Sequence, residues 1–255
     1  MLKVPKVNLG STELRVSKLG FGPFKSKTRP EEGTKLLIES YKLGINFWDT
    51  SDDYGTYPQI ASALKSLPRE EIVISTKTYA KNWKEVKQSL NNSLKELGID
   101  YVDIFLLHSV ESNWAEGCRK LLKQMTDLKK NGVVKVIGLS THSVAVAKKA
   151  AEFSELDVIM AICCKTEQAL IEKFSEHIPL EDGSMEEMFD ALKSIHDNGR
   201  GVIAMKVLGG KASPLIADYE TAIKAVAQFD FVDAMVVGMR SLEEVNKNMK
   251  AIASC

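Results

Sequence analysis

Apolar and polar positions follow one another in a regular order along the 255-residue chain. Short apolar runs of strand length fall near residues 17–21, 45–48, 72–76, 102–107, 133–139, 157–162, 201–205 and 234–237. Amphipathic stretches with helical spacing fall near residues 30–43, 57–66, 83–97, 115–131, 143–154, 185–198, 218–229 and 242–253. Eight strands alternating with eight helices predict an α/β fold, a closed (β/α)8 TIM barrel. A doubly wound sheet fits less well because it usually has fewer strands.

Several helix boundaries can be read directly from the sequence. Gly98, Gly132 and Gly199 each follow a predicted helix at the position where a left-handed cap is needed. Ser184 precedes a helical stretch with Glu187 three residues later, which is a capping-box pattern. These signals support the division into separate helices.

The first segment has a different pattern. Residues 7–16 read as a β-hairpin with its turn at Gly10 and Ser11. In a barrel, such a hairpin would close the bottom. No linker or low-complexity tract interrupts the chain, so we expect residues 1–255 to form a single domain.

Composition excludes several classes of protein. Acidic and basic side chains balance at 34 each, so no nucleic-acid or membrane partner is expected. Residues 1–10 lack a signal-peptide pattern, and no apolar run has the length of a membrane span. The four cysteines, which show no CxxC spacing, are Cys118, Cys163, Cys164 and Cys255. Free thiols in a reducing compartment are the simplest interpretation, which predicts a cytoplasmic protein.

Four polar side chains follow predicted strands at matching places. Asp49, Lys77 and His108 come directly after three successive apolar runs, and Tyr54 lies in the loop after Asp49. In an α/β barrel, the carboxyl ends of the strands bring distant parts of the sequence to one site. Each residue alone has a structural explanation, as a cap, a packed aromatic or a solvated charge. Together they predict an active site.

The four residue types suit a proton transfer. A barrel interior desolvates Asp49 and Lys77, so we expect them to form an ion pair. A cation beside Tyr54 should lower the pKa of the phenol and allow it to donate a proton to a carbonyl oxygen. His108 could orient that carbonyl through a hydrogen bond.

Four segments carry a resemblance to a known family. The stretches 46–55, 74–77, 89–108 and 136–140 resemble the aldo-keto reductases, and the likeness extends from about Leu9 to Ala253. The resemblance implies a TIM barrel that reduces carbonyls with a nicotinamide cofactor, with Asp49, Tyr54, Lys77 and His108 as catalytic residues. The chain is similar to a microbial branch in which some members carry a C-terminal iron–sulfur module. The sequence ends at Cys255 without such a module, so no cluster is expected.

The cofactor cannot be held by a Rossmann loop, because no GxGxxG follows a predicted strand. The loops after the seventh and eighth strands are better suited, although each could simply be a turn or a helix start. The resemblance implies a cofactor-binding set of Gly22, Ser140, Thr141, Met205, Lys206, Leu208, Gly210, Gly238, Met239, Arg240, Ser241, Glu244 and Asn248.

Several cofactor positions depart from the family pattern. Met160 replaces a common Gln, Met205 replaces a stacking aromatic, and Thr141 replaces an Asn. Glu244 stands where an Arg often holds the 2′-phosphate, whereas Arg240 could still reach it. We expect NADPH, with NADH possible.

The loops after the early strands should line a substrate pocket. Phe24, Tyr79 and Trp114 could form an apolar wall, although Trp114 could instead pack on the next helix.

The sequence therefore predicts an NAD(P)H-dependent reductase of a small aldehyde or ketone, acting as a monomer or small homo-oligomer. A cofactor-sensing protein on the same fold is the alternative. A hydrolase ranks last because no second acid lies at a strand end, and the four histidines show no metal-ligand spacing.

Overall fold

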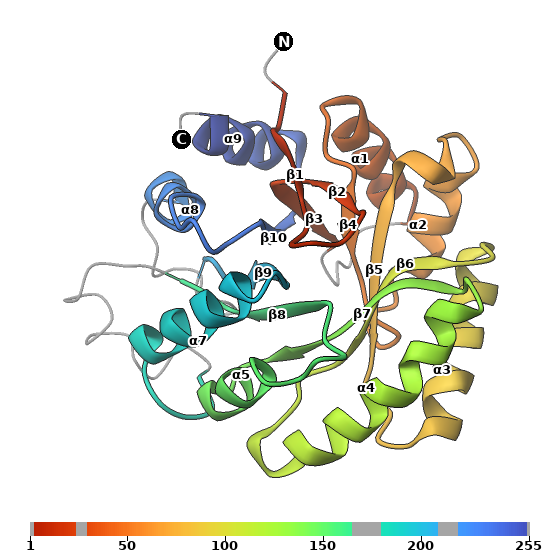
Figure 1. The fold of residues 1–255 in the computed structure, drawn as a ribbon. Helices are drawn as coiled ribbons and strands as arrows, with labels where there is room; N and C mark the ends of the chain where they lie inside the picture. The colour runs from red at the N-terminus through yellow and green to blue at the C-terminus, as the bar shows by residue number, and fades with distance from the viewer. Residues whose placement is uncertain (1–2, 24–29, 165–179, 209–218, 254–255) are drawn as a thin grey trace.

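Eight parallel strands form a closed barrel with helices around it (Figure 1). The computed structural model describes residues 3–23, 30–164, 180–208 and 219–253. The barrel order is β10-β3-β4-β5-β6-β7-β8-β9. The strands are β3 Leu19–Pro23, β4 Phe47–Asp49, β5 Val73–Thr78, β6 Val102–Leu107, β7 Val134–Thr141, β8 Val158–Ile162, β9 Gly201–Met205 and β10 Ala234–Met239. The predicted TIM barrel is confirmed.

Helices connect the strands around the outside of the barrel. They are α1 Pro30–Lys42, α2 Tyr57–Leu64, α3 Trp83–Leu97, α4 Ala115–Lys130, α5 Val144–Ala150, α7 Met185–Asp197, α8 Tyr219–Ala227 and α9 Leu242–Ala253. The described residues also form the 3-10 turns η1 Arg69–Glu71 and η2 Ser112–Trp114. Gly98 caps α3 at φ 67°, and Ser184 and Glu187 form the predicted capping box of α7. None of the helices that the structure describes could cross a membrane.

The hairpin of β1 (Lys6–Asn8) and β2 (Arg15–Ser17) closes the amino-terminal end of the barrel. Leu9 is completely buried and packs in the same cluster as side chains inside the barrel. Gly10 has φ 54°, and a Cβ there would lie 2.3 Å from the backbone nitrogen of Gly201. Only glycine allows so close an approach in this conformation. The predicted position of the hairpin is confirmed.

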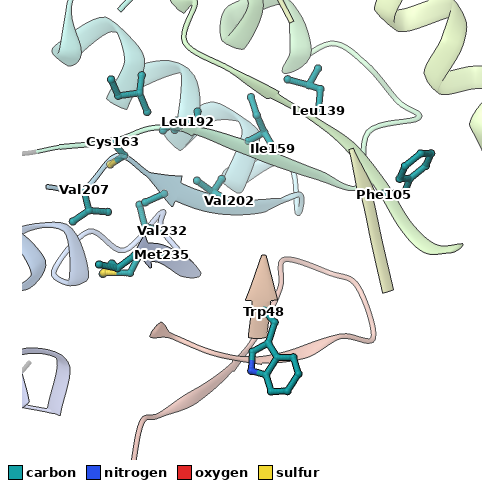
Figure 2. Packing of buried hydrophobic residues seen from close by; sticks show 14 of the residues in the cluster. Trp48, Phe105, Leu139, Ile159, Cys163, Leu192, Val202, Val207, Val232 and Met235 are labelled. Atoms are coloured by element: carbon teal, nitrogen blue, oxygen red, sulfur yellow. The ribbon is translucent and has the colours of Figure 1, made fainter. Parts of the chain in front are cut away.

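Alternation along each strand divides the core into two layers. Ile104 and Leu106 pack inside the barrel, whereas Phe105 and Leu107 between and beyond them pack against the helices. Figure 2 shows part of this outer layer, which includes Leu192 of α7 and Ile159 of β8. The alternation therefore decides which residue of each strand faces the barrel interior.

A repeated hydrogen bond fastens the lower rim of the barrel. At every second strand, an Asn or Asp directly before an inward-facing residue accepts a backbone N–H, which comes from the preceding barrel strand in three cases and from Ser17 of β2 in the fourth. The pairs are Asn46 with Ser17 (2.7 Å), Asp103 with Ile74 (2.9 Å), Asp157 with Ile137 (2.9 Å) and Asp233 with Val202 (2.8 Å). These bonds satisfy backbone donors that would otherwise be buried without a partner.

The carboxylate of Asp103 also forms ion pairs with two cationic side chains. It accepts from Arg69 Nη2 and from Lys135 Nζ, both at 2.8 Å, and its side chain is 2% exposed. The two cations lie 4.2 and 4.4 Å from the centre of the Tyr101 ring. The single negative charge of Asp103 is therefore shared between two cationic side chains.

Asp103→Ala should lower the free energy of unfolding by about 3 kcal/mol, because it leaves a buried N–H and two cations without their acceptor. Denaturant unfolding measures the difference. Asp127→Ala serves as the control, since it removes only an exposed ion pair with Lys130 and should cost less than about 1 kcal/mol. Equal losses in the two variants would contradict the role given to Asp103.

Candidate active site

Three of the four predicted catalytic residues continue the inward-facing rows of their strands. Phe47, Val73 and Leu106 point into the barrel. Counting in steps of two from each of these places Asp49, Lys77 and His108 on the same side at the carboxyl ends. Tyr54 joins them from the loop after β4. The structure brings all four side chains together.

Asp49 and Lys77 form the predicted ion pair inside the barrel. Lys77 Nζ donates to Asp49 Oδ2 at 2.6 Å and to the carbonyl oxygen of Thr50 at 2.7 Å. Lys77 is 1% exposed and Asp49 is 5% exposed. Burial raises the pKa of the Asp49 carboxyl, and the charge of Lys77 opposes that shift.

The Tyr54 hydroxyl lies 3.4 Å from His108 Nε2, and Lys77 Nζ lies 5.1 Å from the centre of the Tyr54 ring. The expected lowering of the tyrosine pKa is wrong. Burial raises the pKa of Tyr54, and the negative charges of Asp49 and Asp53 raise it further. Lys77 is paired with Asp49, and its attraction for a phenolate is smaller than the effect of desolvation. Tyr54 consequently keeps its proton at neutral pH.

His108 is fixed on three sides. Its Nδ1 lies 3.0 Å from Ser51 Oγ, its Nε2 faces Tyr54, and its ring stacks on Tyr79 with centroids 4.2 Å apart. Burial lowers the pKa of His108 to about 3, and the charge of Lys77 acts in the same direction. The imidazole is therefore neutral, with one nitrogen as donor and the other as acceptor.

Sequence reasoning missed the contact of Ser51 with His108. The signal was available, because extending the alternation two residues past Asp49 reaches position 51. The same step past Lys77 reaches Tyr79, which was predicted as a pocket wall and is 52% exposed above the His108 ring.

The other predicted pocket residues have different outcomes. Trp114 packs close to Gly117 in the first turn of α4, and Lys81 Nζ lies 5.7 Å from its ring centre. Trp114 therefore packs on the next helix, which was the alternative to a place in the pocket wall, and its contact with a substrate stays a prediction. Phe24 lies outside the described residues.

Two neighbouring hydroxyls at the end of β7, those of Ser140 and Thr141, have different hydrogen-bond partners. Ser140 Oγ accepts the backbone N–H of Ser109 at 2.9 Å, which leaves its own proton for another acceptor. Thr141 Oγ1 donates to the carbonyl oxygen of Val110 and accepts from Ser143 N. The hydroxyl of Thr141 is therefore used within the protein, whereas that of Ser140 can still donate.

Two glycines open the inner wall on the opposite side. Gly22 of β3 pairs in register with Gly238 of β10, and both have the inward-facing parity of their strands. Met160 and Met205 pack in the inner layer of β8 and β9. A Cβ at position 22 would lie 3.0 Å from Cγ1 of Val236, so glycine allows β3 and β10 to pair closely here, and a cofactor contact of either glycine stays a prediction.

Lys206 follows β9 with φ 57°, a left-handed conformation that is uncommon outside glycine. Its charge contributes to lowering the pKa of both His108 and His142. His142 Nε2 is buried without a hydrogen-bond partner among the described residues. Leu208 is half-buried at the end of the described segment, and Gly210 lies outside it.

The segment after β10 caps α9. Glu244 N donates to Ser241 Oγ at 3.2 Å, and the Glu244 carboxylate accepts from Arg240 N at 2.7 Å. Met239 and Asn248 are buried. These residues therefore form the start of a helix, as one of the two interpretations expected, and their contacts with a cofactor stay predictions.

No group of three or more His, Cys, Asp or Glu side chains within the described ranges could hold a metal ion. The three described cysteines are buried free thiols, and burial raises the pKa of Cys164 to about 11.

Known proteins match this chain over nearly its whole length. A model of the Aldo/keto reductase family matches residues 18–213. L-galactose dehydrogenase of Arabidopsis thaliana is 25% identical over 306 residues, covering 99% of this chain and 89% of that protein. The NADH-specific methylglyoxal reductase of Escherichia coli is 26% identical over 189 residues, covering 61% of this chain and 58% of that protein.

A solved structure is similar in fold. The holo form of an aldo-keto reductase from Bacillus halodurans matches with a TM-score of 0.75 and 23% identity, covering 98% of this chain and 90% of that one. The sequence resemblance and the barrel agree with the family match. The chain belongs to the aldo-keto reductase family and is an NAD(P)H-dependent oxidoreductase that reduces carbonyl groups.

Proposed function

We propose that Tyr54 donates the proton in this carbonyl reduction. The observation that supports the assignment is the position of its hydroxyl, 3.4 Å from His108 Nε2 and beside the buried Lys77. Because burial raises the pKa of Tyr54, the phenol is protonated at the start of the reaction. Proton donation then needs a group that stabilises the phenolate, and the Lys77 ammonium fulfils that role.

The remaining roles follow from charge and geometry. When bound, a reduced nicotinamide supplies a hydride to the carbonyl carbon. Tyr54 gives its O–H proton to the carbonyl oxygen, so that an alcohol and a phenolate result. Neutral His108 donates a hydrogen bond to the same oxygen and supports the charge that develops on it. Asp49 holds Lys77 in place.

The described residues fit a nicotinamide in the mouth. Ser140 offers a hydroxyl proton to the carboxamide oxygen, and the glycines at 22 and 238 leave backbone accessible to a ring. We propose NADPH as the preferred cofactor, with Arg240 facing the 2′-phosphate, although a relative from Escherichia coli is named for NADH. Glu244 would then accept from a ribose hydroxyl.

We propose a small aldehyde or ketone as the substrate, with the exposed face of Tyr79 as part of the apolar wall. A single domain acting as a monomer or small homo-oligomer in the cytoplasm is part of the same proposal. Among the described residues, no contact favours a cofactor sensor over a reductase.

Tyr54→Phe should reduce turnover of a reactive aromatic aldehyde by at least about 100-fold, because the ring remains and only the proton donor is lost. Fluorescence titration should give an unchanged Kd for NADPH. Tyr57→Phe is the matched control, since that hydroxyl bonds to Thr76 and Ser93 outside the catalytic group. Full activity of Tyr54→Phe would rule out this assignment.

The rate of reduction should be level between about pH 5.5 and 8.5 at saturating cofactor. The pKa of His108 is lowered, so the imidazole is uncharged throughout this range, and the pKa of Tyr54 is raised, so the phenol stays protonated. A profile of kcat/KM for the aldehyde tests this. An inflection near pH 6.5 would show a histidine with its ordinary pKa and contradict the structure.

Native protein should bind NADPH at least about tenfold more tightly than NADH, and Arg240→Ala should remove most of that difference. Titrations with both cofactors measure it. Lys250→Ala in the last turn of α9 removes the same charge elsewhere and should leave the ratio unchanged. Equal affinity of native protein for the two cofactors would overturn the NADPH preference.

A further inference from the structure

We propose that Ser51 is a positioning residue that holds His108 in the tautomer with its proton on Nε2. The proposal deepens the proposed function, since it explains how His108 presents a donor to the carbonyl oxygen. Ser51 lies between Asp49 and Tyr54 in the loop after β4, and its side chain is completely buried. The inference rests on where its single hydroxyl proton can go.

The Ser51 hydroxyl has three acceptors within reach, at unequal distances. His108 Nδ1 lies 3.0 Å from Ser51 Oγ. The carboxylate of Asp52 and the carbonyl oxygen of Lys77 both lie at 3.4 Å. Hydrogen bonds weaken toward the longer distance, so Nδ1 is the favoured acceptor. A ring nitrogen that accepts a hydrogen bond uses its lone pair, so it cannot carry a proton itself.

The neutral imidazole has a single N–H, so an accepting Nδ1 requires a protonated Nε2. This arrangement turns the N–H toward the Tyr54 hydroxyl, where the carbonyl oxygen must lie during proton transfer. The opposite tautomer would direct an Nε2 lone pair at that oxygen. The lone pair of Nε2 would repel the lone pairs of the carbonyl oxygen. The site would also lose a hydrogen-bond donor at the atom on which negative charge develops.

Other groups around His108 also act on its orientation and on the position of its proton. The Tyr79 ring stacks on the imidazole at an interplanar angle of 30° and restrains its plane. Lys77, Lys206 and His142 act on its charge and disfavour the protonated ring. The Asp53 carboxylate lies 3.9 Å from Nδ1 and attracts a proton to that nitrogen. Ser51 is 0.9 Å closer than this competitor.

Removal of the Ser51 hydroxyl should therefore let the proton move to Nδ1, where Asp53 attracts it. In Ser51→Ala, nitrogen NMR of the histidine rings should show a shift of His108 from the Nε2–H form toward the Nδ1–H form. The signal is assigned by its loss in His108→Asn. The value of kcat/KM for aldehyde reduction should fall about tenfold, with the Kd for NADPH unchanged.

Two further variants separate positioning from packing. Ser40→Ala removes a buried hydroxyl that bonds, within the described residues, to the Leu36 carbonyl oxygen in α1, and it should change neither the tautomer nor the rate. Asp53→Asn removes the competing charge and should keep His108 in the Nε2–H form. In Ser51→Ala combined with Asp53→Asn, part of the lost rate should return, which a purely structural role of Ser51 does not predict.

The native protein alone can overturn the proposal, even if Ser51→Ala fails to fold. A native His108 with its proton on Nδ1 would do so. An unchanged tautomer in Ser51→Ala would also overturn the proposal. A changed tautomer with an unchanged rate of reduction would overturn it as well. The NMR measurement needs no turnover, so it is independent of the Tyr54→Phe result. If Tyr54→Phe stays fully active, the proposed function fails while the tautomer of His108 remains measurable.

Discussion

The buried ion pair of Lys77 and Asp49 is the constraint on which the barrel mouth depends. Moving two charges out of water costs several kcal/mol for each ion, and only a short contact with further hydrogen bonds offsets that cost. Lys77 makes both the contact with Asp49 and a second bond to the carbonyl oxygen of Thr50. Burial keeps the neighbouring Tyr54 phenol protonated and the His108 imidazole neutral, and the charges of Asp49 and of Lys77 act in the same directions on their pKa values. The site therefore begins the reaction with a protonated phenol and a neutral imidazole.

Much of this arrangement was predictable from the sequence, because a strand has a period of two. The predicted runs mark all eight barrel strands to within a few residues, and counting in twos places Asp49, Lys77 and His108 inside the mouth. The same counting reaches Ser51, yet its partner could not be predicted. Which side chain Ser51 meets depends on the shear of the barrel, and that quantity is set by the pairing of all the strands together.

The incorrect expectation about Tyr54 has a physical cause that a sequence does not carry. A nearby cation lowers a phenol pKa, desolvation and nearby carboxylates raise it, and the net direction depends on which effects are larger. Burial and two nearby carboxylates reverse the sign. Thr141 illustrates a similar limit, because a hydroxyl adjacent to Ser140 looks equivalent in the sequence. Alternation points it to the other side of the strand, where Val110 and Ser143 occupy it.

The two ends of the barrel use opposite faces of the strands for different purposes. At the lower rim, polar side chains such as Asp103 and Asp233 are on the outward-facing row and bond the backbone of the neighbouring strand. At the mouth, polar side chains such as Lys77 are on the inward-facing row. The rim bonds and the hairpin hold the strands in register, and register fixes the distance between Asp49 and Lys77. Strand register at one end thus helps to set the position of the ion pair at the other, and a rigid scaffold of this kind is what a site of fixed geometry needs.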